Sequence, residues 1–83
     1  MSRIDFSRIR NLTARQVVRA LLKDGFSFER QRGSHHRYSH PDGRLVTVHF
    51  SAPSNTFLRR TLHSIVGQAG WEQEDLQRLG LID

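Results

Sequence analysis

The sequence predicts one α+β domain in which a helix is followed by three strands, a second helix and a short closing helix. Apolar residues recur at helical spacing near residues 13–24 and again near 58–69, which indicates two amphipathic helices. Between them, residues 26–50 show strand-like alternation, interrupted by the turn-forming run Pro41-Asp42-Gly43. Two apolar helical stripes and one apolar strand face predict a three-stranded antiparallel sheet with the helices on one face. With 83 residues, of which 36% are hydrophobic, the chain can build one modest core.

The first helix has clear start and stop signals. Thr13 is a capping residue, and Gln16 three residues later completes a capping box. Gly25 stands where a left-handed residue ends a helix. The apolar stripe between them consists of Val17, Val18, Ala20, Leu21 and Leu22. Residues 1–12 precede this helix and are interpreted as a basic N-terminal docking arm.

The turn at residues 41–43 fixes the register of the second and third strands. With a three-residue loop, His40 faces Arg44. Counting backward along the second strand and forward along the third, the pairing then continues residue by residue until His35 faces His49. This register gives the two strands a core face and an opposite face. The core face carries Tyr38, Val46, Val48 and Phe50, with His36 on the same side, whereas the opposite face carries His35, Arg37, Thr47 and His49.

The second helix is expected to bury one side and to end at Gly70, where Trp71 packs at the junction. Its apolar side consists of Leu58, Leu62, Ile65, Val66 and Ala69. Residues 72–83 form a short acidic C-terminal segment, with a helix near 72–79 that packs through Leu76 and Leu79.

Charge is unevenly distributed along the chain. Residues 1–66 hold twelve of the thirteen basic side chains and four of the eight acids, whereas residues 67–83 hold one base and four acids. Arginine supplies twelve of the bases, and its planar guanidinium suits phosphate, so the basic body predicts an anionic partner such as nucleic acid. The chain has no cysteine, no apolar run of membrane-spanning length and no signal-peptide core, so we expect a cytoplasmic protein without membrane contact.

The segment from Gly33 to Arg37 carries the residues best suited to chemistry. Gly33 allows backbone close to a ligand, Ser34 adds a hydroxyl, and His35 can exchange protons near neutral pH. Arg37 projects from the same strand face and could hold a phosphate beside that base. The alternative is that His35 is an ordinary exposed strand histidine.

Other residues support or limit this hypothesis. His49 faces His35 in the expected register and could act as the acid of a pair, although simple strand exposure also explains it. Four further arginines are candidate RNA contacts: Arg30, Arg32, Arg59 and Arg60. No metal site is expected, because strand alternation separates His35 from His36 and His40. We expect no cofactor.

The order of motifs over residues 18–70 resembles the HicA toxin family. The matching residues are Leu21-Leu22-Lys23-Asp24-Gly25-Phe26, Arg30-Gln31-Arg32-Gly33-Ser34-His35-His36, His40-Pro41-Asp42-Gly43-Arg44, Val46-Thr47-Val48 and Thr61-Leu62-His63-Ser64-Ile65-Val66-Gly67-Gln68-Ala69-Gly70-Trp71. The resemblance implies a double-stranded-RNA-binding-domain-like fold and metal-independent mRNA cleavage by a histidine aligned with His35. It also implies inhibition by a HicB-like antitoxin.

This chain departs from the family pattern after the third strand. Many members have a proline and then a second histidine there, whereas this chain reads Val48-His49-Phe50-Ser51. The resemblance over residues 18–70 nevertheless implies an endoribonuclease toxin acting on single-stranded mRNA. A non-catalytic RNA-binding module using the same basic surface is the alternative, and a domain that binds an acidic protein is a third reading.

Overall fold

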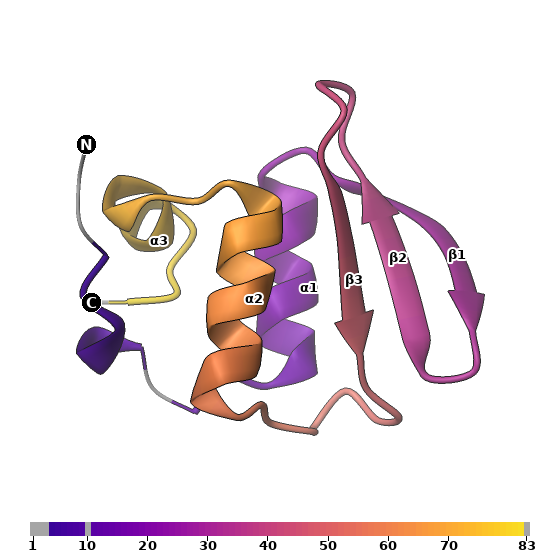
Figure 1. The fold of residues 1–83 in the computed structure, drawn as a ribbon, viewed down its shortest axis with the longest axis horizontal. Coiled ribbons are helices and arrows are strands. Elements are labelled where there is room, and N and C mark those ends of the chain that lie inside the picture. Colours follow the sequence, from indigo (N-terminus) through magenta and orange to yellow (C-terminus); the bar gives the residue numbers. More distant parts are fainter. Residues whose placement is uncertain (1–3, 10, 83) are drawn as a thin grey trace.

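The computed structural model describes residues 4–9 and 11–82 and arranges them in three layers (Figure 1). The sheet forms one layer, α1 and α2 lie together on one side of it, and α3 lies beyond α2. The elements in chain order are the 3-10 turn η1 (Phe6–Arg8), α1 (Ala14–Lys23), β1 (Ser27–Arg32), β2 (His35–Ser39), β3 (Leu45–His49), α2 (Arg59–Ala69) and α3 (Gln73–Arg78). The predicted α+β class and element order are confirmed.

The sheet is antiparallel with strand order β1-β2-β3. The β2–β3 register runs from His35 opposite His49 to Ser39 opposite Leu45, as the loop length predicts. The His40 N–H donates to the Arg44 carbonyl at 2.9 Å, which closes the three-residue loop. Gly43 adopts a φ of 98°, a conformation that few other residues tolerate.

The β1–β2 pair contains a bulge that the sequence did not predict. Phe28 faces Tyr38, but the next pair is Arg30 with Arg37, so Glu29 is an extra residue in β1. The turn between these strands consists of Gly33 and Ser34. Gly33 has a φ of 60° and Ser34 has a negative φ, the pattern of a type II′ hairpin turn.

Helix α1 begins and ends as predicted, but not every residue of its apolar stripe is buried. The Gln16 N–H donates to Thr13 Oγ1 at 3.2 Å and the Thr13 N–H donates to the Gln16 side chain at 2.8 Å, a complete capping box. Val17 and Leu21 are buried, whereas Leu22 is 51% exposed. Leu22 was expected in the core, and the expectation is wrong because its side chain lines an open groove between α1 and the sheet and is not covered there.

Helix α2 begins one residue later than its apolar spacing suggests. Leu58 is its N-cap residue, with extended backbone and a 68% exposed side chain, so its assignment to the core is corrected. Leu62, Ile65, Val66 and Ala69 are buried as expected. Gly70 adopts the left-handed conformation that ends the helix, and Trp71 is buried behind it.

The chain ends form the layer beyond α2. Ile9 and Leu12 are buried, and the Phe6 ring stacks on the His63 ring with centroids 3.5 Å apart, so the described part of residues 1–12 packs on the body rather than forming a free arm. Residues 1–3, Arg10 and Asp83 lie outside the described residues. Four apolar residues of the C-terminal segment are buried, namely Leu76, Leu79, Leu81 and Ile82. This segment therefore belongs to the core.

Asp24 joins these layers through its carboxylate. It accepts hydrogen bonds from Trp71 Nε1 at 2.9 Å, from Arg44 Nη1 at 3.1 Å and from Arg78 Nη2 at 2.8 Å. Burial alone would raise the pKa of Asp24, but the hydrogen bonds from Trp71, Arg78 and Arg44 outweigh it and hold the pKa below its ordinary value. One carboxylate thus connects the end of α1 to the β2–β3 turn and to α3.

Candidate active site on the outer face of the sheet

The face of the sheet that points away from the helices carries two stacked histidines. His35 on β2 and His49 on β3 are direct cross-strand partners, and their rings lie nearly parallel with centroids 4.4 Å apart and an interplanar angle of 15°. Both side chains are exposed. The pair therefore presents two imidazole rings to a ligand approaching from solvent.

Three arginines share this outer face with the histidines. Arg32 on β1 pairs with His35, and Arg30 pairs with Arg37 in the next row. A depression of about 160 Å³ lies over these rows and is lined by Arg30, Arg32, His35, Arg37 and Thr47. The sheet thus gathers three guanidinium groups around one histidine, which is the chemistry that binds a phosphate.

The bulge at Glu29 is what places Arg30 and Arg32 on the outer face. Without the extra residue, the pairing of Phe28 with Tyr38 would continue as Glu29 with Arg37, and Arg30 would then share the core side with His36. Sequence reasoning missed this step. The extra residue is Glu29 and not a glycine, so nothing in the local sequence marks the bulge.

Glu29 also forms an ion pair with one arginine of this face. Its carboxylate lies 3.2 Å from Arg37 Nε, and both side chains are partly exposed. The Arg37 Nε atom is itself covered and makes no aligned hydrogen bond, so the contact with Glu29 is an ion pair by distance and not by hydrogen-bond geometry. Arg37 is therefore held beside Glu29 by charge, while its Nε–H group has no well-aligned hydrogen-bond acceptor.

The Gly33–Ser34 turn fixes the start of β2 beneath His35. The Phe50 N–H donates to the Ser34 carbonyl at 2.9 Å, and His36 Nδ1 lies 3.0 Å from the same oxygen. The His36 ring stacks on the Phe50 ring with centroids 3.8 Å apart. His36 thus faces the core side, as predicted, and only His35 of the adjacent pair reaches the outer face.

The remaining candidates lie elsewhere. Arg59 lines a small recess with Phe6, Asn11 and other residues, separate from the depression at His35, and Arg60 is exposed on the first turn of α2. No group of three or more histidine, cysteine or acidic side chains suited to a metal ion occurs within residues 4–9 and 11–82. In that same part of the chain, no helix has the length and apolar character needed to cross a membrane.

A comparison with protein-family models gives a match to the HicA toxin of bacterial toxin–antitoxin systems over residues 14–71, more than half of the chain. The chain belongs to the HicA toxin family. The matched range includes all three strands, the outer-face depression and α2. A search of curated proteins found no match. The family assignment makes the chain a toxin component whose partner is an antitoxin.

Proposed function

We propose that this HicA-family toxin is an endoribonuclease that cleaves single-stranded mRNA without a metal ion, with His35 as the general base. One observation carries the proposal: His35 shares a depression with Arg30, Arg32 and Arg37 and stacks on a second histidine. The arginines bind the phosphodiester backbone, and the histidines move protons at the scissile bond.

In the proposed reaction, the RNA's own 2′-hydroxyl attacks the neighbouring phosphorus. Neutral His35 accepts the 2′-hydroxyl proton as the new phosphorus–oxygen bond forms, and the bond to the 5′-oxygen breaks. Protonated His49, or a water molecule, gives a proton to that leaving oxygen. The products are a 2′,3′-cyclic phosphate and a free 5′-hydroxyl, so the reaction requires no oxidant and no added nucleophile.

The stacked geometry suits an in-line displacement. The attacking and leaving oxygens lie on opposite sides of phosphorus and are separated by two phosphorus–oxygen bonds. Parallel rings with centroids 4.4 Å apart can each direct one nitrogen at one of these oxygens. Arg37 would then bind the non-bridging oxygens as their negative charge grows. Ser34, at the start of the same strand, is a candidate for positioning the RNA backbone.

The family assignment also supports a protein partner for the toxin. We propose a HicB-like antitoxin that blocks the cleavage and a site of action in the cytoplasm, where mRNA is translated. His49 stands where many family members have proline. The proposed role of His49 as the acid is therefore specific to this chain and does not follow from the family resemblance.

Incubation of the purified protein with single-stranded RNA in EDTA tests the proposal. We expect shorter RNA with 2′,3′-cyclic phosphate ends, and no cutting where a 2′-deoxynucleotide replaces the nucleotide before the scissile bond. His35→Ala should abolish most cleavage, whereas His63→Ala removes a histidine outside the depression and should not. Binding of RNA without any cleavage would favour the non-catalytic RNA-binding alternative.

A further inference from the structure

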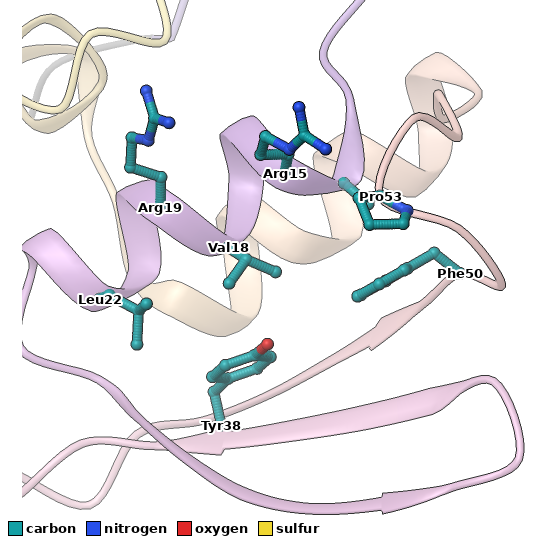
Figure 2. A pocket seen from close by; sticks show the side chains of 8 residues that line it. Arg15, Val18, Arg19, Leu22, Tyr38, Phe50 and Pro53 are labelled. Atoms are coloured by element: carbon teal, nitrogen blue, oxygen red, sulfur yellow. The ribbon is translucent and has the colours of Figure 1, made fainter.

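A groove of about 380 Å³ lies between α1 and the core side of the sheet, away from the His35 face. Figure 2 shows Val18 and Leu22 pointing from α1 toward Tyr38, with Phe50 beside them at the end of β3. Tyr38 is buried, whereas Val18 and Phe50 are half-buried and Leu22 is 51% exposed. The groove is therefore open to solvent, at a place where α1 does not fully cover the sheet, and is not a closed cavity.

The apolar surface continues beyond the groove onto β1. The Phe28 ring packs edge-on against the Tyr38 ring with centroids 5.8 Å apart, and Phe28 is 54% exposed. Leu22 and Phe28 are two of the large apolar side chains that this small domain leaves in water. Contiguous apolar surface of this kind marks an interaction site more often than a fault of folding.

The walls of the groove are held by the backbone. Pro53 forms one end, and its carbonyl accepts a hydrogen bond from the Arg15 N–H at 3.0 Å. The Asn55 carbonyl accepts one from the Ala14 N–H at 2.8 Å, so the loop after β3 is fastened to the start of α1. A preformed groove requires little reordering when a ligand enters it.

The charge at the rim indicates the nature of the ligand. Arg15 and Arg19, one turn apart on α1, border the groove and extend away from its floor (Figure 2). None of the described residues that line the groove is acidic. A ligand that fits must therefore place apolar groups on the floor and negative charge beside the arginines.

These features favour a protein segment over nucleic acid. RNA bases bind apolar surfaces by stacking on open aromatic faces. Here one face of Phe50 is covered by the His36 ring, and Tyr38 is only 5% exposed. Aliphatic side chains supply the rest of the floor, and they suit leucine-like side chains of a helix or strand.

We propose that this groove docks an acidic, amphipathic segment of a partner protein, with its apolar residues over Val18 and Leu22 and its carboxylates against Arg15 and Arg19. The site is separate from the proposed nuclease site, because Tyr38 and His35 project from opposite faces of β2. A test of this docking site is therefore independent of whether the protein cleaves RNA.

A designed peptide provides the test. The probe is a synthetic helical peptide with leucines at positions i, i+4 and i+7 and glutamates beside them, titrated into the full-length protein and followed by backbone NMR. We expect shifts centred on Val18, Leu22, Tyr38 and Phe50. Leu22→Asp should weaken binding by at least about tenfold, whereas Leu58→Asp, the same change at an exposed leucine outside the groove, should not.

A charge exchange sharpens the test. The double variant Arg15→Glu, Arg19→Glu should lose the glutamate peptide and prefer a version in which lysines replace the glutamates. Absence of binding at millimolar peptide, or equal loss for Leu22→Asp and Leu58→Asp, would overturn the proposal. Two further results would overturn it, because each would show a different occupant of the groove. One is a single-stranded RNA oligonucleotide that shifts the NMR signals of the groove residues. The other is a dimer, seen by sedimentation, that Leu22→Asp dissociates.

Discussion

Arg44 and Arg78 differ from Arg30 and Arg32 in what surrounds them. Arg44 Nε lies 2.9 Å from Asp42, and its Nη1 contacts both Asp24 and the Ala69 carbonyl. Arg78 contacts Asp24 at 2.8 Å and Asp75 at 3.0 Å. These two arginines each meet two carboxylates, so they join elements of the fold.

The outer-face arginines have far less negative charge around them. Arg30, Arg32 and Arg37 line one depression, and Glu29 is the acid paired with this group. The comparison separates two groups of arginines. Carboxylates neutralise Arg44 and Arg78, which join elements of the fold, whereas the arginines of the outer face are left in excess and are the candidates for recognition. The following predictions test that division, from the largest expected effect to the smallest.

His35→Ala should reduce RNA cleavage by about 10²–10⁴-fold, because general acid–base catalysis contributes about that much. RNA affinity and the free energy of unfolding should stay close to the wild-type values, since His35 is exposed. Single-turnover cleavage and thermal unfolding measure the two effects. If His49 is the acid, the wild-type pH–rate profile is bell-shaped and His49→Ala removes one limb. Cleavage by His35→Ala at the original rate would end the catalytic hypothesis.

Asp24→Ala should lower the free energy of unfolding by about 2–4 kcal/mol, because it leaves Trp71, Arg44 and Arg78 without their shared acceptor. Urea denaturation measures the loss. Asp42→Ala, which removes a half-exposed partner of Arg44, is the matched control and should cost much less. Equal losses would show that Asp24 is not the central contact.

Replacing Arg30, Arg32 and Arg37 together by alanine should weaken RNA binding about 10–100-fold at low salt and reduce the salt slope by about 2, at about 0.7 per lost phosphate contact. Unfolding should change little, which is the opposite of the result for Asp24. The double variant Arg59→Ala, Arg60→Ala removes charge outside the depression and should have the smaller effect on affinity. An unchanged salt slope in the triple variant would assign the outer face another role.

Acid should weaken the contacts of Asp24. The folded-state pKa of Asp24 lies below its ordinary value, so its stabilising contribution is complete above that ordinary value, near pH 4, and is lost as the pH falls through the folded-state pKa. Asp24→Asn should therefore flatten the loss of stability below about pH 4, and stability measured from pH 2 to 7 checks it. If the stability of Asp24→Asn falls as steeply below pH 4 as that of the wild type, other carboxylates cause the loss of stability in acid.

The two hairpins show how far the sequence could predict this site. The register of β2 and β3 was predictable, because Pro41 and Gly43 define the loop and Val46 and Val48 must be buried. The face of Arg30 and Arg32 was not, because every residue of β1 is exposed and no burial pattern constrains the strand. Glycine often marks a bulge, but here the extra residue is Glu29, so no local signal announced it.

The errors in the helices have a similar cause. Leu22 and Leu58 continue the apolar spacing of their helices, and spacing alone assigns them to the core. Their exposure depends on where α2 begins and on how much of the sheet the two helices cover, which are tertiary properties. The catalytic role of His35 stays a prediction, because placement beside arginines supports the chemistry without measuring it.

The smallest expected effect concerns Glu29. Its carboxylate lies 3.2 Å from Arg37 Nε, so it would compete with the RNA phosphate that we propose for the same guanidinium. Glu29→Gln should therefore tighten RNA binding by about two- to fivefold, the range of a partly exposed ion pair, and leave the single-turnover cleavage rate of bound RNA unchanged. Glu74→Gln removes the same charge from α3, and any gain it gives measures the general effect of net charge. Weaker binding or slower cleavage by Glu29→Gln would instead mean that Glu29 holds Arg37 in position, and the carboxylate would then belong with the structural acids beside Arg44 and Arg78.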